Sequence, residues 1–526
     1  ELSAFPTVNV VQAFSGRVAG VQIKQNTGAP GGSISVRIRG TNSIKGSNEP
    51  LYVVDGFPIS GTSLTFINNS EIESIQILKD ASATAIYGSR GANGIVLVTT
   101  KSGKAGKTKV DIESTFGNQV LSKKLELTNA TEYARIYNEM LTNDGLPPYF
   151  SESDINSLGK GFDWQDFVFR KALIHTHDVT VTGGNDKTQF SMTGSVFEQE
   201  GIIKNSNHNR YSFRSNFNHN ISEKFSINYT TLLTKINERY QNSGVGSRGN
   251  SLISAALGAY PTKTPFNEDG TYLNLGASYP WGTELKNPIN WINEELSFGK
   301  ANKVLAHVAF TYKPVEGLAL KIMGGVENND SRNDYYRTLK FIGSNGSASV
   351  SDGQSTSFLN ENTITYTKSF GVHSITAMGG FTFQNFKYTS LGGSGTGFLS
   401  DVTETYNLGS ASVPGIPNSG YSLSTLLSLI SRVNYNYNNK YLFTLTFRSD
   451  GSSKYTPGNK WGYFPSAAFA WRISNESFMD NLNFISDLKL RSSWGVTGSQ
   501  AISAYATLNQ LFASKTVFND ALYTTF

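Results

Sequence analysis

One stretch decides the fold: residues 189–196 have the sequence QFSMTGSV, in which polar and apolar side chains alternate. Because successive side chains of a β-strand point to opposite faces, this pattern predicts a strand with one apolar face and one polar face. The same alternation recurs after about residue 107. The clearest further examples lie at 211–218, 225–230, 307–313 and 441–448. Segments of this kind are typical of barrels that face lipid on one side and a polar lumen on the other.

The connections between these segments are alternately short and long. Short turns are expected at 183–186, 220–223, 314–317, 369–372 and 438–439. Long connections are expected at about 118–173, 235–302, 328–356 and 385–425. Membrane barrels have short turns on one side and long loops on the other, whereas a soluble β-sandwich has no reason to keep this order. The pattern therefore favours a transmembrane antiparallel β-barrel over a sandwich.

The first hundred residues have a different pattern, in which short strands and short helices are mixed. Strands are expected at 34–39, 51–54, 74–78 and 95–100. Asp80 is expected to cap a helix that Gly88 ends, and the capping-box pattern at 70–73 predicts another short helix. This part of the chain is therefore predicted to be a small α+β domain.

The composition excludes several classes of protein. The net charge of +5 is small and no long basic run is present, so binding to nucleic acid is not expected. The absence of cysteine removes disulfides, thiolate metal sites and cysteine nucleophiles. The sequence has no run of about 18 apolar residues, so no transmembrane helix is predicted. Since no catalytic grouping stands out either, we expect no enzyme activity, no cofactor and no metal.

Three local patterns suggest ligand sites, but each has a simpler structural interpretation. The segment 103–108 ends like a nucleotide-binding loop, yet Lys101 stands where its first glycine is required. His175 and His177 share a strand face and could bind a metal, although a place at the membrane interface is favoured. Residues 450–453 begin like a calcium loop but lack its later acidic residues, so a hairpin turn is expected.

Several motifs of the first hundred residues share their order and spacing with one family of transporters. They are Gly16–Ile23, Gly28–Gly31, Val36–Thr41, Pro50–Gly56, Leu78–Gly88 and Ser89–Val96. Together they resemble the plug domain of the SusC/RagA family of TonB-dependent outer-membrane transporters. Weaker matches to the barrel of that family lie at Arg448–Ser453, Trp461–Ser466 and Ser493–Gln500.

The resemblance implies a partial transmembrane antiparallel β-barrel with an N-terminal α+β plug domain inside its lumen. We expect the plug at residues 1–103, without its N-terminal part, and the barrel at 104–526, incomplete at its C-terminus. The TonB box and the β-sandwich domain that precede the plug in this family are not found. Since such barrels have about 22 strands and roughly thirteen candidates are present here, an open sheet edge is expected.

The function implied by the resemblance is TonB-dependent import of a nutrient, preferably an oligosaccharide, across the outer membrane of a Gram-negative bacterium. The implied partners are a SusD-like surface lipoprotein, the TonB complex and outer-membrane lipid. A peptide importer and a TonB-dependent signalling receptor remain alternatives. A surface barrel without transport is disfavoured, because it would need no plug.

The plug motifs supply the candidate site residues. They are Arg37, Arg39, Gly40, Asp55, Gly56, Lys79, Asp80, Tyr87, Gly88, Arg90, Gly91, Asn93 and Gly94. Arg37 and Arg39 are expected on a strand and, with Arg90, are expected to pair with carboxylates of the inner wall of the barrel. Such pairs would either shift when the plug moves or only hold it in place, and in both cases breaking one is costly.

Substrate binding is assigned to the long connection 235–302 and to the turn 42–48. The connection combines aromatic rings with amides and carboxylates, a mixture that suits sugars and also peptides. The candidate residues are Asn42, Ser43, Asn48, Tyr279, Trp281 and Trp291. The alternative is that these aromatic rings pack the loop or contact the lipoprotein.

Overall fold

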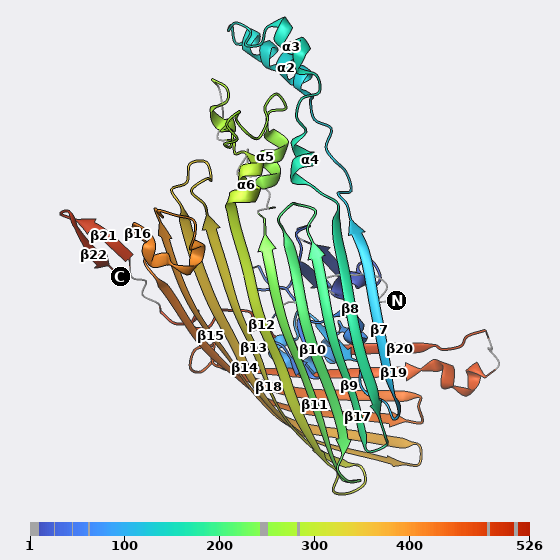
Figure 1. Cartoon of the computed structure of the whole chain (residues 1–526). Coiled ribbons are helices and arrows are strands. Elements are labelled where there is room, and N and C mark those ends of the chain that lie inside the picture. The colour runs from blue at the N-terminus through green and yellow to red at the C-terminus, as the bar shows by residue number, and fades with distance from the viewer. Residues whose placement is uncertain are drawn as a thin grey trace.

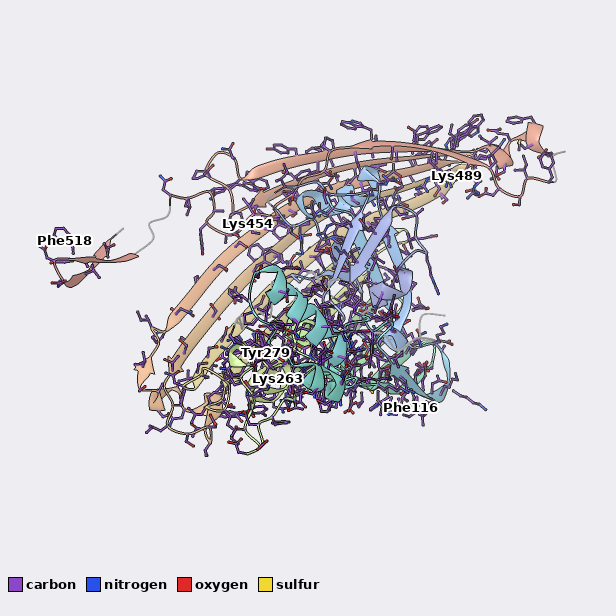
Figure 2. All side chains as sticks on the ribbon, turned by 90° about the horizontal axis from the view of Figure 1, so that it is seen from above. Phe116, Lys263, Tyr279, Lys454, Lys489 and Phe518 are labelled. Carbon is purple, nitrogen blue, oxygen red and sulfur yellow. The ribbon has the colours of Figure 1, made fainter. Side chains whose placement is uncertain are left out.

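The computed structural model describes residues 10–25, 27–44, 46–61, 64–241, 243, 251–280, 285–480, 484–509 and 514–525. One large, curved antiparallel sheet dominates the structure, and a smaller N-terminal domain lies on its concave side (Figure 1). The view from above shows the sheet as an open arc around that domain (Figure 2).

The large sheet has fourteen strands, and its path orders thirteen of them from β7 to β20. They are β7 (Gly106–Gln119), β8 (Ala172–Gly184), β9 (Thr188–Glu200), β10 (Asn207–Asn220), β11 (Phe225–Tyr240), β12 (Glu295–Tyr312), β13 (Leu318–Arg337), β14 (Ser347–Phe370), β15 (His373–Thr396), β17 (Asn418–Tyr437), β18 (Tyr441–Ser452), β19 (Trp461–Arg472) and β20 (Lys489–Gly495), while β16 (Val413–Pro414) pairs only with β15. Within the described residues β7 and β20 are the two edges and do not pair, so the expected open sheet is confirmed.

The two faces of the sheet differ as the alternation predicts. In β9, Met192 is 43% exposed on the convex face, whereas Ser191 and Thr193 are buried against the N-terminal domain. The convex face carries a continuous set of exposed apolar side chains, including Phe213, Phe310, Ile364 and Phe443. No helix in the described part of the chain combines the length and apolar character needed to span a membrane.

The strands extend well beyond the segments that alternate. β14 and β15 have 24 residues each, which corresponds to roughly 80 Å against a hydrocarbon core of about 30 Å. The expected long connections at 328–356 and 385–425 are therefore wrong in extent, since the ones observed are 338–346 and 397–417. The sequence from 328 to 356 is mostly polar on both faces, which is typical of a loop. In the structure its two ends nevertheless pair as antiparallel strands, with Asn328 opposite Thr356.

The short turns lie at one end of the sheet and the longer connections at the other, as expected (Figure 1). Two connections break the alternation in length: β9 and β10 are joined at the loop end by only residues 201–206, and β19 and β20 are joined at the turn end by the longer segment 473–488. The described residues of the two longest loops contain five α-helices: α2 (Ala130–Asn143), α3 (Glu152–Leu158), α4 (Trp164–Val168), α5 (Leu252–Gly258) and α6 (Pro288–Glu294). A separate hairpin follows at β21 (Ser514–Phe518) and β22 (Ala521–Thr525).

The N-terminal domain is the predicted mixture of strands and short helical segments. The hairpin β1 (Val21–Gln25) and β2 (Ile34–Ile38) accompanies a second sheet in the order β4 (Phe57–Pro58), β3 (Leu51–Val54), β6 (Ile95–Thr100) and β5 (Ile72–Leu78). Helix α1 (Ala81–Thr84) starts after Asp80 and continues into the 3₁₀ segment η3 (Ala85–Arg90). The helix expected to begin at residue 70 is wrong, because the 3₁₀ turn η2 (Asn69–Glu71) ends there and β5 follows at once.

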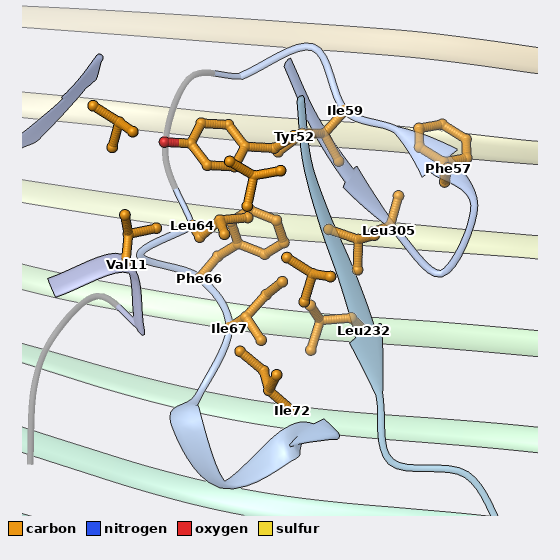
Figure 3. Packing of buried hydrophobic residues seen from close by; sticks show 14 of the residues in the cluster. Val11, Tyr52, Phe57, Ile59, Leu64, Phe66, Ile67, Ile72, Leu232 and Leu305 are labelled. Atoms are coloured by element: carbon orange, nitrogen blue, oxygen red, sulfur yellow. The ribbon is translucent and has the colours of Figure 1, made fainter. Parts of the chain in front are cut away.

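Apolar side chains of this domain pack directly against the concave face of the sheet. Figure 3 shows Ile67, Phe66 and Ile59 beside Leu232 of β11 and Leu305 of β12. Each of these five side chains is almost fully buried. Burial of large apolar side chains stabilises by roughly 1.5–3 kcal/mol each, so this apolar contact contributes to holding the domain on the sheet.

Candidate functional site: the interface of the two domains and the cavity above it

One deeply buried polar contact between the domain and the sheet is centred on Asp450 of β18. Its Oδ2 accepts hydrogen bonds from the backbone N and the Oγ of Ser89, both at 2.7 Å. Its Oδ1 accepts a bond from Arg448 Nε at 2.6 Å, with the carboxylate side chain only 1% exposed. A carboxylate removed from water in this way is stabilised only while these donors stay in place.

A glycine permits this close approach. Gly88 has a φ of +50°, and a Cβ atom at that position would collide with Asp450 Oδ2. Beside it, Arg448 donates from Nη1 to the carbonyl of Ile86 at 2.5 Å and from Nη2 to Ser428 Oγ at 2.8 Å. Gly88 therefore brings the end of the helical segment against the wall, where any larger residue would separate the two.

Arg90 contacts the wall through neutral groups. Its Nη1 donates to Gln384 Oε1 of β15 at 2.8 Å, and its Nη2 donates to the carbonyl of Ile59 at 2.7 Å. The guanidinium lies over the Phe386 ring, 5.4 Å from its centroid. The prediction that Arg90 pairs with a wall carboxylate is therefore wrong in its partner, although the side chain does reach the wall.

Arg37 and Arg39 pair within the N-terminal domain, which corrects the expected pairing with the wall. Arg37, on β2, forms an ion pair with Glu49, and Arg39 Nη2 lies 2.7 Å from Asp80 Oδ1. Arg39 also lies just after β2, with a φ of +58° rather than on the strand. The chain turns there toward Gly40, so the strand pattern ends one residue earlier than the alternation suggests.

A second polar contact, which the sequence analysis missed, surrounds Glu71. This fully buried carboxylate accepts a bond from Ser212 Oγ of β10 at 3.1 Å. The neighbouring β10 residue Arg214 donates to Thr100 Oγ1 at 2.7 Å, and Arg210 donates to a backbone carbonyl of the N-terminal domain at 2.6 Å. Burial raises the pKa of Glu71 to about 7, while the charges of Arg214 and Arg210 act in the opposite direction.

We predict that this carboxyl makes the seated domain less stable as the pH rises. The pKa of Glu71 is raised from 4.5 to about 7 in the folded state. Its contribution to stability is therefore fully present below the unfolded-state pKa and is lost as the pH rises through the folded-state pKa. Between about pH 5 and about pH 8, the free energy of unfolding should fall by a few kcal/mol. Thermal unfolding measured across this range checks the prediction.

The Glu71→Gln variant should remove most of this pH dependence, because glutamine keeps the bond to Ser212 and does not titrate. Glu73→Gln is the matched control, since Glu73 is exposed two residues away. An unchanged pH dependence in Glu71→Gln would contradict the assignment.

Two further contacts lie along the same interface. Glu327 of β13 accepts from the N and Oγ of Ser60 at 2.7 and 2.8 Å, and its other oxygen lies 3.1 Å from Lys303 Nζ of β12. Asn68 donates from Nδ2 to Asp178 Oδ1 of β8 at 2.8 Å. Hydrogen bonds therefore join the N-terminal domain to strands spread across the sheet.

Above this interface, on the side of the long loops, lies a cavity of about 760 Å³. The N-terminal domain contributes one wall, with Glu49, Ser60 and Arg90. The sheet contributes the opposite wall, including Lys303 and Tyr388. Because the wall is shared, any ligand in the cavity would contact both domains at once.

The other motif residues shape the N-terminal domain itself. Asp55 accepts from the backbone N of Thr100 at 2.8 Å, Lys79 Nζ donates to the carbonyl of Ala19 at 2.6 Å, and Asn93 Nδ2 donates to the carbonyl of Ser47 at 2.8 Å. The remaining members lie in turns or helical segments of the same domain: Gly40, Gly56, Asp80, Tyr87, Gly91 and Gly94.

The predicted substrate residues fall in two separate places. Asn42, Ser43 and Asn48 form one turn, in which Asn48 Oδ1 accepts from the backbone N of Asn42 and of Ser43 at 2.7 and 2.8 Å. Tyr279 and Trp291 are each only 5% exposed.

Tyr279 and Trp291 belong to the hydrophobic core of the loop helices. Tyr279 contacts Tyr260 and Phe150 by ring packing and has Lys263 over its face at 5.0 Å (Figure 2). This favours the alternative that the aromatic rings pack the loop. Trp281, the sixth candidate, lies outside the described residues.

Comparison with known proteins agrees with this geometry. The family model of the TonB-dependent receptor plug domain matches residues 1–95. The TonB-dependent receptor SusC of Bacteroides thetaiotaomicron is 33% identical over 562 residues, covering 100% of this chain and 54% of SusC. The RagAB peptide transporter superposes with a TM-score of 0.86 at 26% identity, covering 100% of this chain and 62% of the matched chain. This chain belongs to the SusC/RagA family of TonB-dependent receptors.

Other relatives place this SusC/RagA chain within a wider set. The TonB-dependent receptor P3 of Formosa agariphila is 34% identical over 527 residues, covering 99% of this chain and 51% of the receptor. The ferric citrate transporter FecA, at 11% identity and a TM-score of 0.52, shares the fold alone. The chain spans about half the length of the curated relatives it matches.

The family assignment confirms the predicted fold class, a partial β-barrel with a plug domain. The N-terminal domain is accordingly called the plug below, and the large sheet is called the wall. SusC, P3, RagAB and FecA are named as receptors and transporters, and none of these four names is that of an enzyme.

Proposed function

We propose that this chain forms the gate and part of the wall of an importer in the outer membrane of a Gram-negative bacterium. The observation that carries the proposal is the plug, whose described residues between 10 and 103 lie on the concave face of the wall beneath a cavity on the side of the long loops. We assign residues 1–103 to this plug. A substrate enters that cavity from outside and passes only when the plug moves. The chemistry required is binding and conformational change, without the breaking of covalent bonds.

The shared wall of the cavity supports coupling between substrate binding and gating. A ligand that contacts Arg90 of the plug and Tyr388 of the wall loses its contacts with the plug when the plug is displaced. Displacement also breaks the bonds of Asp450 and Glu327 to the plug. Because these groups are buried, breaking their bonds needs external work, which the TonB complex would supply.

The surroundings of the chain follow from the same proposal. The exposed apolar side chains on the convex face of the wall are placed to contact outer-membrane lipid. The long loops, with their helices α2–α6, form the outer surface on which a SusD-like lipoprotein would dock. The boundary of the wall at residues 104–526 is part of this proposal.

An oligosaccharide is the favoured substrate, because the cavity is lined by hydroxyl and amide side chains and by aromatic rings. Ser422, Ser424, Asn93 and Tyr388 are examples. A peptide is the second candidate, favoured by the structural likeness to the RagAB peptide transporter. Both classes need hydrogen-bond partners and apolar faces, which this lining offers.

Uptake by cells tests the function. The whole gene, expressed with its neighbouring lipoprotein, should give saturable uptake of labelled oligosaccharides, and an uncoupler that dissipates the proton-motive force should abolish it. A peptide panel run in parallel decides between the two substrates. Uptake that persists at the same rate with the uncoupler would show a passive pore and overturn the proposal.

A further inference from the structure

The charges around the cavity are unequally compensated. Three carboxylates line it: Glu49 pairs with Arg37, Glu327 pairs with Lys303, and Glu238 contacts the imidazole of His208. The charges of Glu49 and Glu327 are therefore compensated by Arg37 and Lys303.

Four cations line the same cavity, and three of them, Arg90, Lys387 and Lys454, form no ion pair among the residues that the structure describes. Arg90 donates to the amide oxygen of Gln384 and to a backbone carbonyl. Lys454, in the connection between β18 and β19, donates from Nζ to the carbonyl of Gln500 at 3.3 Å. Within the ranges that the structure describes, neither Arg90 nor Lys454 lies within ion-pair distance of a carboxylate.

The backbone of Gln500 brings these two cations together. Its N donates to the carbonyl of Ser89, the residue before Arg90, at 3.1 Å. Its carbonyl accepts the bond from Lys454. Burial and, after it, the charge of Arg90 lower the pKa of Lys454, as expected when two like charges share a partly buried site. An anion bound between them would relieve this repulsion.

An aromatic ring lies on the same wall. Gln384 and Phe386 of β15 both face the plug, since Arg90 bonds to the first and covers the second. Tyr388 follows at the same two-residue spacing, lines the cavity and is 47% exposed. Its ring is placed to stack against the C–H face of a sugar. The hydroxyl groups of nearby side chains would form hydrogen bonds with the hydroxyls of that sugar.

We propose that the substrate is an acidic oligosaccharide, one of whose carboxylates binds between Arg90 and Lys454 while a sugar ring lies on Tyr388. This inference rests on the proposed importer function and names its substrate class. A carboxylate there meets two cations that form no ion pair among the described residues, in a partly dehydrated site, where charge-assisted hydrogen bonds are strongest.

Calorimetry on the full-length receptor with its lipoprotein tests the proposal, with a uronic-acid oligosaccharide and the same oligosaccharide after chemical reduction of its carboxyl groups as probes. The acidic form should bind roughly tenfold to a hundredfold more tightly, and added salt should reduce this preference. Lys454→Gln should lose most of the preference and Lys454→Arg should keep it. Lys460→Gln, an exposed lysine of the same connection, should bind like the unchanged receptor.

Equal binding of the two oligosaccharides, or an unchanged preference in Lys454→Gln, would overturn the inference. Binding of acidic peptides without binding of either oligosaccharide would also overturn it. These failures are distinct from failure of the proposed function, because energised uptake of a neutral sugar or a peptide would leave the importer standing.

Discussion

Replacement of Asp450 by alanine is expected to lower the free energy of unfolding by about 3–5 kcal/mol. The variant removes the acceptor of two bonds from Ser89 and leaves Arg448 buried beside the plug without its carboxylate. An uncompensated buried charge is the costly part of this change, so the effect should exceed that of losing the hydrogen bonds alone. Thermal and denaturant unfolding of the full-length receptor measure it.

Two controls separate this pairing from a general loss of stability. Asp186→Ala changes an exposed aspartate in the turn between β8 and β9 and should alter the free energy of unfolding by less than about 0.5 kcal/mol. Replacing both Asp450 and Arg448 by leucine and methionine should be less damaging than Asp450→Ala, because no charge is left unpaired. A double variant as unstable as the sum of the single variants would contradict the proposed pairing.

The sequence predicted the strands wherever one face meets an apolar environment and the other does not. Alternation located β9, β10 and β11 because their convex side chains are apolar and their concave ones polar. It failed in the outer halves of β13 and β14, where most residues on both faces are polar and no period remains. Backbone pairing extends those strands, and single-sequence patterns carry no signal for it.

The candidate site was predicted in part, for a related reason. Gly88 and Arg90 could be singled out because short motifs surround them, but their wall partners are far away in sequence: Ser89 and Asp450 are 361 residues apart. The pairs of Arg37 and Arg39 were misassigned because nearer partners, Glu49 and Asp80, satisfy them inside the plug.

Glu71 was missed as a site residue, since its position in a capping-box pattern suggested a helix start. Its neighbours Asn69, Ser70 and Glu73 are polar, so nothing in the local sequence indicated that this carboxylate is buried. The aromatic residues of the long loop illustrate the opposite error. Tyr279 and Trp291 resemble a sugar-binding surface in sequence, but their rings form the core of the loop helices.

The largest effect on function is expected from tethering the plug to the wall. Asn68 of the plug donates a hydrogen bond to Ser195 of β9, and the chain has no cysteine, so the pair Asn68→Cys and Ser195→Cys can be joined by a short, cleavable thiol reagent. Thr180→Cys with Thr193→Cys is the matched control, because these hydroxyls lie 3.1 Å apart on two strands of the wall and a tether between them leaves the plug free.

Energised uptake by cells that carry these cysteine pairs tests most directly whether the plug is the gate. We predict that uptake is lost while the plug is tethered, returns when the reagent is cleaved, and is unaffected by the tether within the wall. Full uptake with the plug-to-wall tether intact would contradict the gating role, because the substrate would then cross without displacement of the plug.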